Sequence, residues 1–109
     1  MSYSVELSEH FKREAKRLAK KYRSLKTELT GLFEELEQNP TLGTPLGSSV
    51  YKIRLAITSK GKGKSGGARV ITYVEVDDTT VLLLSIYNKG EKDTITDKEI
   101  KELLDAYAK

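Results

Sequence analysis

Apolar and polar residues follow two periods along this chain of 109 residues, and the first is helical. Between residues 9 and 38 apolar side chains recur every three or four positions, which predicts amphipathic α-helices. Ser8 precedes the first helix, expected over 9–22, and Ser24 can cap a second that Asn39-Pro40 ends. Two amphipathic helices joined by so short a link predict an antiparallel helical hairpin.

The second period is that of β-strands. Apolar side chains alternate with polar ones over 51–58, and runs rich in β-branched and aromatic residues occupy 68–76 and 80–87. The turn residues 77–79 separate the last two runs, so an antiparallel meander is predicted. A short strand is expected over 3–7. The segment TLGTPLGSS over 41–49 is predicted to be a loop because of its glycine, proline and serine content.

The C-terminal segment predicts a further helix. Thr96 and Glu99 form a capping box, and Ile95 can pack on Ile100 as a hydrophobic staple. The predicted order is β-α-α-β-β-β-α in one domain over 1–109. We expect an α+β fold in which the helical hairpin covers one face of a mostly antiparallel four-stranded sheet and leaves the other face partly open.

Composition excludes several kinds of chemistry. The chain has no cysteine and one histidine, His10, so disulfides, zinc-thiolate sites, thiol nucleophiles and a two-histidine nuclease are not expected. The Asp77-Asp78 pair is better explained by a turn than by a metal site. The sequence lacks an apolar run of about 20 residues and a secretion signal, so we expect a cytoplasmic protein with no membrane partner. No metal, cofactor or small-molecule partner is expected.

Positive charge is concentrated in one stretch. From residue 52 to 69 the chain carries no acidic side chain and six basic ones: Lys52, Arg54, Lys60, Lys62, Lys64 and Arg69. Three of the lysines lie in a glycine-rich loop, which could be a solubilising linker or an anion-binding loop; its spacing is not that of a nucleotide-binding P-loop. The other three cations are predicted to lie on the flanking strands, and we expect them together on the uncovered side of the sheet. Fixed cations repel one another unless an anion binds, so a phosphate-rich partner is predicted.

These residues could also cleave RNA without a metal ion. A base would take the proton of a 2′-hydroxyl, a cation would stabilise the charged transition state, and a donor would protonate the leaving 5′ oxygen. Neighbouring cations disfavour a charged lysine, so Lys52 is a candidate base, and Arg69 is suited to hold the phosphate. Tyr87 could stack on a base, exchange a proton or only close the edge of the core. Lys89 and Lys92 beyond it could bind RNA or be solvated surface.

Four segments carry a resemblance to a known family: YSVELSEHFKREAKRLAKKYRSLK, YKIRLAI, SGGARVITYV and LLLSIYNKGEKDTITDKEI. Together with the order of elements they resemble the RelE/ParE superfamily of bacterial type II toxins, in particular its RelE/HigB-like branch. The resemblance implies a small toxin neutralised by a cognate antitoxin protein, and metal-independent cleavage of mRNA at the ribosome by basic residues.

The resemblance also assigns residues. The family's basic pair corresponds to Lys52 and Arg54, its next arginine to Arg69, and the basic residue after the last strand to Lys89. The family's C-terminal tyrosine has no counterpart in DTITDKEI, and Tyr87 is the nearest candidate. Lys60, Lys62, Lys64 and Lys92 are the expected additional RNA contacts. Two alternatives stay open: a ParE-like inhibitor of DNA gyrase without nuclease activity, and a non-catalytic RNA-binding relative.

Overall fold

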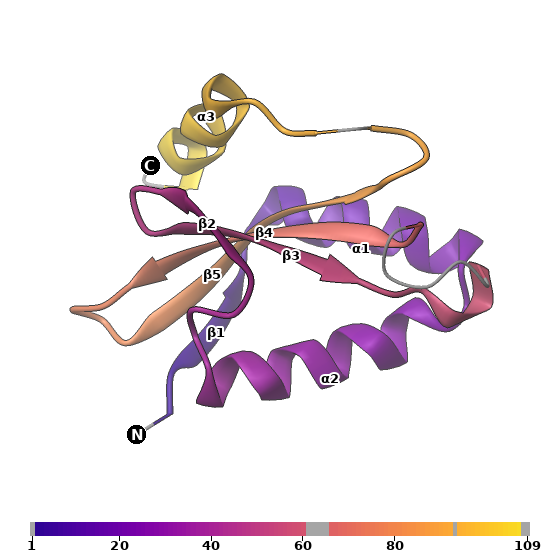
Figure 1. Ribbon diagram of the computed structural model, residues 1–109, viewed down its shortest axis with the longest axis horizontal. Coiled ribbons are helices and arrows are strands. Elements are labelled where there is room, and N and C mark those ends of the chain that lie inside the picture. Colours follow the sequence, from indigo (N-terminus) through magenta and orange to yellow (C-terminus); the bar gives the residue numbers. More distant parts are fainter. Residues whose placement is uncertain (1, 61–65, 93, 108–109) are drawn as a thin grey trace.

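The structure is a computed structural model, and it describes residues 2–60, 66–92 and 94–107. Most of its helices and strands lie where the sequence pattern predicts them (Figure 1). In chain order they are β1 (Ser4–Leu7), α1 (Glu9–Lys21), α2 (Leu25–Gln38), β2 (Thr44–Gly47), β3 (Val50–Leu55), the 3-10 helix η1 (Thr58–Lys60), β4 (Ala68–Glu75), β5 (Thr80–Asn88) and α3 (Asp97–Tyr107).

The strands form one sheet in the order β1-β5-β4-β3-β2, with β1 and β5 parallel and the other neighbours antiparallel. The predicted α+β class with a mostly antiparallel sheet is confirmed, but the sheet has five strands rather than four. The extra strand is β2, which lies in the segment expected to be a loop. It turns back onto β3 through Gly47, Ser48 and Ser49, whose φ angles are +94°, +53° and +64°.

The N-terminal ends of the helices test the capping residues that were predicted from the sequence. The Ser8 hydroxyl caps α1 by accepting from the Phe11 amide at 3.0 Å, and it donates to the Leu84 carbonyl at 3.1 Å. Thr96 and Glu99 form the predicted capping box of α3 through reciprocal hydrogen bonds. Ser24 does precede α2, but the prediction that its side chain caps this helix is wrong. Among the described residues its hydroxyl makes no cap bond to α2; it bonds to Ser59 and donates to Glu28.

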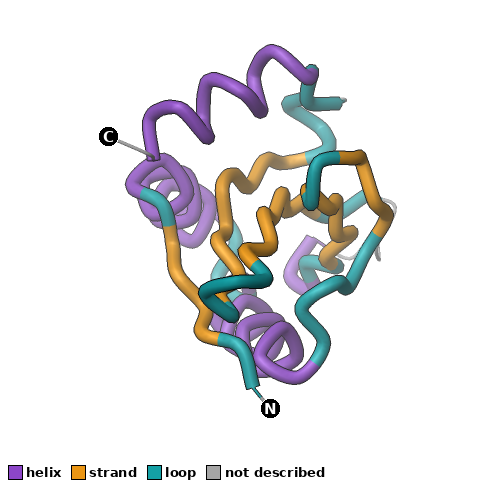
Figure 2. Tube along the Cα trace, turned by 90° about the vertical axis from the view of Figure 1, so that its left-hand side faces the viewer, coloured by secondary structure: helices purple, strands orange, loops and turns teal. Residues whose placement is uncertain are grey.

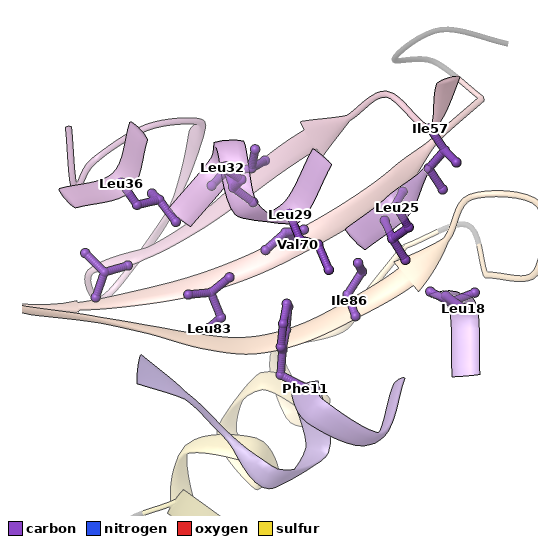
Figure 3. Close-up of a cluster of buried hydrophobic side chains, with 13 residues drawn as sticks. Phe11, Leu18, Leu25, Leu29, Leu32, Leu36, Ile57, Val70, Leu83 and Ile86 are labelled. Atoms are coloured by element: carbon purple, nitrogen blue, oxygen red, sulfur yellow. The ribbon is translucent and has the colours of Figure 1, made fainter. Parts of the chain in front are cut away.

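The main core lies between the helical hairpin and one face of the sheet, as predicted. Figure 3 shows the apolar side chains of α1 and α2 pointing at those of the central strands. Burial of each large aliphatic or aromatic side chain contributes roughly 1.5–3 kcal/mol. The labelled members of this cluster are Phe11, Leu18, Leu25, Leu29, Leu32, Leu36, Ile57, Val70, Leu83 and Ile86.

A second, smaller core lies on the opposite face, where α3 packs. In Figure 2 the strands lie between α3 at the top and the α2 coil at the bottom. Ile100 of α3 joins Ile71, Leu84 and Tyr87 of the sheet in one buried cluster. Side chains of β5 alternate between the two cores, and the register shift at Leu84 moves this alternation by one position, so that Ile86 joins the main core and Tyr87 the second. The face opposite the hairpin is therefore covered in part.

Candidate functional site

Arg54, Arg69 and Tyr87 form one row across three neighbouring strands. Arg54 of β3 is paired directly with Arg69 of β4, and Arg69 is paired directly with Tyr87 of β5. Directly opposed residues of antiparallel strands point to the same face of a sheet. Lys52 lies two residues before Arg54 on β3 and so shares this face. The structure thus brings together four of the five residues predicted to be catalytic.

These four side chains differ in their access to solvent. Arg54 is exposed and Lys52 is half-buried. Arg69 is only 4% exposed, its Nη1 donates to the Ala68 carbonyl at 3.2 Å, and Tyr87 is only 6% exposed. The expectation that all the cations lie on an uncovered surface is therefore wrong for Arg69. The alternation of side chains along the strands predicted the correct face of the sheet for these cations. It could not show that α3 and the segment before it pack on the same face.

Tyr87 belongs to the second core rather than to an open stacking platform. Its ring packs in the cluster that includes Ile100 of α3, and the Lys92 ammonium lies 5.9 Å from the ring centroid. Lys92 also forms an ion pair with Glu99. The hydrogen bond from Lys92 lowers the pKa of the Glu99 carboxyl below its ordinary value. The interpretation of Tyr87 as a residue that closes the core agrees with this placement.

Lys60 is directed away from that row. Its Nζ donates to the Asn88 side-chain oxygen at 2.7 Å and lies 5.3 Å from the centroid of the Tyr22 ring, beside α1. Its role as an RNA contact stays a prediction. Lys62 and Lys64 lie outside the described residues.

The turn after β5 carries Lys89 and is held from two sides. The Lys89 amide donates to the Gly67 carbonyl at 3.1 Å, which joins the turn to the start of β4. Arg17 of α1 donates to both carboxylate oxygens of Glu91, at 3.0 and 3.3 Å. This pair lowers the pKa of the Glu91 carboxyl and raises the pKa of Arg17. Lys89 itself is half-buried.

A groove of about 710 Å³ runs between α2 and the free part of the β3 edge. Lys52 and Arg54 line it on the β3 side, and Glu28 and Glu35 of α2 line the other wall. Within the described residues, neither Lys52 nor Arg54 forms an ion pair with a carboxylate. Both cations are thus available to an anionic ligand.

No helix in residues 2–60, 66–92 and 94–107 has the length and apolar character needed to cross a membrane. In that part of the chain, no three His, Asp or Glu side chains come together in a way that could hold a metal ion.

Sequence reasoning missed the residues that hold the end of β5. Tyr22, Asn88 and the Arg17–Glu91 pair connect α1 with the turn that carries Lys89. The Asn-Lys-Gly run over 88–90 is a turn signal that could have indicated Asn88. The partners on α1 could not be found that way, because they lie 66 and 74 positions away in sequence.

Several solved structures have the same fold as this chain. A free-state variant of the Escherichia coli toxin RelE with two arginines changed to alanine superposes with a TM-score of 0.65 at 18% identity, over 97% of this chain and 98% of that one. The Mycobacterium tuberculosis RelBE2 toxin-antitoxin complex gives 0.60 at 20% identity, over 81% and 99%. The intact E. coli RelBE complex gives 0.59 at 19% identity, over 80% and 96%. This is the fold of small toxins from toxin-antitoxin systems.

A sequence model of one such family matches residues 8–109, nearly the whole chain; it describes the RelE toxin of the RelE/RelB toxin-antitoxin system. The chain therefore belongs to the RelE toxin family, as its sequence motifs predicted.

Proposed function

We propose that this toxin is a metal-independent endoribonuclease that cleaves translated mRNA at the ribosome, in the cytoplasm. The observation that carries the proposal is the row of Arg54, Arg69 and Tyr87 with Lys52 beside it, in a chain that belongs to a toxin family. Two arginines at directly opposed positions present their guanidinium N–H donors on one face of the sheet, and such donors suit the oxygens of a phosphate. The arrangement therefore favours a phosphodiester as the ligand.

The reaction we propose is an internal transesterification. The 2′-hydroxyl of the RNA loses its proton to a base, its oxygen attacks the adjacent phosphorus, and the bond from phosphorus to the 5′ oxygen breaks. The departing 5′ oxygen takes up a proton. The products are a 2′,3′-cyclic phosphate and a 5′-hydroxyl, and no oxidant, reductant or water molecule is consumed.

Each basic residue has a proposed role in that reaction. Arg54 is exposed and would make the first contact with the phosphate, while Arg69 behind it would stabilise the charge that develops in the transition state. Lys52 is the proposed base, and Lys89 at the end of β5 would contact the RNA and supply a proton. Tyr87 is buried, so we propose that it supports Arg69 and Lys92 and does not stack on a base.

We also propose that a cognate antitoxin neutralises the toxin. Two of the similar structures, RelBE2 of M. tuberculosis and RelBE of E. coli, are toxin-antitoxin complexes. An antitoxin would need to keep RNA away from the Arg54 and Arg69 row. Co-expression of the adjacent reading frame should therefore restore the growth of cells that produce the toxin.

The test is to map RNA ends in cells after brief induction of the toxin. Primer extension should reveal new 5′ ends inside translated messages with the wild-type protein and not with Arg69→Ala, provided that circular dichroism shows this variant to be folded. Exposed Arg13 on α1 supplies the matched control, Arg13→Ala, which should cleave like the wild type.

Whole messages together with loss of supercoiling by purified gyrase would instead establish the ParE-like alternative. RNA binding that weakens with salt but gives no product would identify a non-catalytic relative.

A further inference from the structure

Asn88, the last residue of β5, is buried and joins three separate segments. It is 3% exposed, and its Nδ2 donates at 3.0 Å to the hydroxyl of Tyr22, the residue that caps the C-terminal end of α1. Its Oδ1 accepts from Lys60 Nζ of η1 at 2.7 Å and from the Gly90 amide at 3.2 Å. All of its side-chain polar atoms are therefore engaged, as a buried amide requires.

The same residue shapes the turn that follows β5. Its backbone carbonyl accepts from the amides of Glu91 and Lys92 at 2.9 and 3.0 Å. Its side-chain oxygen accepts from the Gly90 amide, only two residues further on. The turn carries Lys89 at its second position and brings Lys92 back to the Tyr87 ring, with its Nζ 5.9 Å from the ring centroid. The backbone positions of Lys89 and Lys92 therefore depend on Asn88.

Asn88 also lies next to the row of proposed functional residues. It is paired with Ala68, one position beyond the pair of Arg69 and Tyr87. Its side chain reaches α1, whereas Tyr87 faces α3. It can thus influence the row through the backbone on which Tyr87 and Lys89 stand, without touching RNA itself.

We propose that Asn88 is a positioning residue for RNA cleavage: it fixes the turn after β5 against α1 so that Lys89 and Lys92 face the phosphate held by the arginine row. This inference rests on the proposed nuclease function. The side-chain oxygen is the decisive atom, because it binds both Gly90 in the turn and Lys60 in η1. A displacement of about 1 Å in a reacting group can cost about a hundredfold in rate.

Two substitutions separate positioning from simple structural support. Asn88→Ala removes every side-chain bond. Asn88→Asp keeps an acceptor for Gly90 and Lys60, and the Tyr22 hydroxyl can reverse and donate to the carboxylate. The matched control is Asn39→Ala, at the exposed C-terminal end of α2.

The assay is cleavage of mRNA on purified programmed ribosomes, with kcat and KM for the ribosome complex measured separately. We expect Asn88→Ala to lower kcat by at least about tenfold with KM within about threefold, because the turn positions the reacting groups. Asn88→Asp should recover kcat to within about threefold of the wild type, because its acceptor remains. Hydrogen exchange should show lost protection of the Gly90 and Lys92 amides in Asn88→Ala and retained protection in Asn88→Asp, and Asn39→Ala should match the wild type in every readout.

Wild-type kcat in Asn88→Ala overturns the inference. So does an equal loss in the alanine and aspartate variants, since the acceptor is then irrelevant. If Asn88→Ala does not fold, Tyr22→Phe replaces it: without the hydroxyl that holds Nδ2 the amide can rotate and withdraw its oxygen from Gly90 and Lys60, so kcat should fall a few-fold, and an unchanged kcat overturns the inference. A wild-type protein that leaves the message whole overturns the proposed function, and this inference with it, whereas equal cleavage by wild type and Asn88→Ala overturns the inference alone.

Discussion

The direct pairing of Arg54 with Arg69 predicts that the site costs stability. Replacement of Arg54 by glutamine removes the exposed charge of the pair and keeps a long polar side chain on β3. The variant should be more stable than the wild type and less active in RNA cleavage. Both effects come from one cause, because the repulsion that destabilises the folded protein is what an RNA phosphate would relieve.

The size of the effect follows from the pairing. Opposed residues of antiparallel strands have Cβ atoms about 5 Å apart, which places two arginine charges roughly 7 Å apart. Two like charges at that distance repel by about 0.6 kcal/mol in bulk water and about 2.4 kcal/mol at an effective dielectric constant of 20. Arg54 is exposed and Arg69 makes further interactions of its own, so the lower end applies, and we expect about 0.5–1 kcal/mol. For a domain of this size that gain raises Tm by roughly 3–5 °C.

Urea unfolding at two salt concentrations measures the gain. At about 20 mM salt Arg54→Gln should be the more stable protein, and at about 1 M salt, where the Debye length is near 3 Å, the difference should disappear. Arg13→Gln on α1 is the matched control. It lowers net charge equally without changing the strand pair, and its stability should stay within about 0.5 kcal/mol of the wild type.

A gain that persists at high salt would refute the electrostatic reasoning, as would an equal gain in Arg13→Gln. A loss of stability in Arg54→Gln would show that the side chain contributes packing or hydrogen bonds that outweigh the repulsion.

Three further predictions concern the fold. Thr72→Val should stabilise the protein by about 1 kcal/mol in urea unfolding, because the buried Thr72 hydroxyl has no hydrogen-bond partner within the described residues. Gly67→Ala should cost about 2 kcal/mol, since a Cβ there would collide with the Leu55 carbonyl. Glu99→Gln should cost about 0.5 kcal/mol at pH 7. The hydrogen bond from Lys92 lowers the pKa of the Glu99 carboxyl, so its stabilisation is present above the ordinary pKa and is lost as pH falls through the lowered pKa, below which variant and wild type should converge.

Matched controls accompany those three variants. Thr44→Val changes an exposed strand threonine and should leave stability nearly unchanged. Gly31→Ala has open space around its Cβ in α2 and should stabilise the helix slightly. Glu102→Gln changes an exposed glutamate of α3 and should show no comparable loss at pH 7. A destabilised Thr72→Val, a neutral Gly67→Ala, or a Glu99→Gln deficit that is constant with pH would each contradict its prediction.

The helices and four of the strands could be predicted because their signals are local. Periodic apolar residues and the Thr96–Glu99 box depend on positions within a few residues of one another. The strand β2 could not, because Thr44–Gly47 contains proline and glycine and has no alternation of apolar and polar residues. Its extended conformation is stabilised by pairing with β3, which is tertiary structure.

The residues of the candidate site could be predicted from the sequence, but their exposure to solvent could not. Alternation along β3 placed Lys52 and Arg54 on one face, and the direct pairing of Arg69 with Arg54 agrees with that interpretation. The 4% exposure of Arg69 depends on how α3 and the chain before it return to the sheet, and no local pattern specifies that path. Asn88 was missed for the same reason, since its partners come from distant segments.

The chemical nature of the RNA ends produced on purified programmed ribosomes in the presence of a chelator tests the proposed metal-independent cleavage. We expect a 2′,3′-cyclic phosphate and a 5′-hydroxyl from the wild type, no product from folded Arg69→Ala, and no cleavage of a message whose scissile nucleotide is 2′-deoxy. Undiminished cleavage by Arg69→Ala, or cleavage of the 2′-deoxy message, would contradict the proposal.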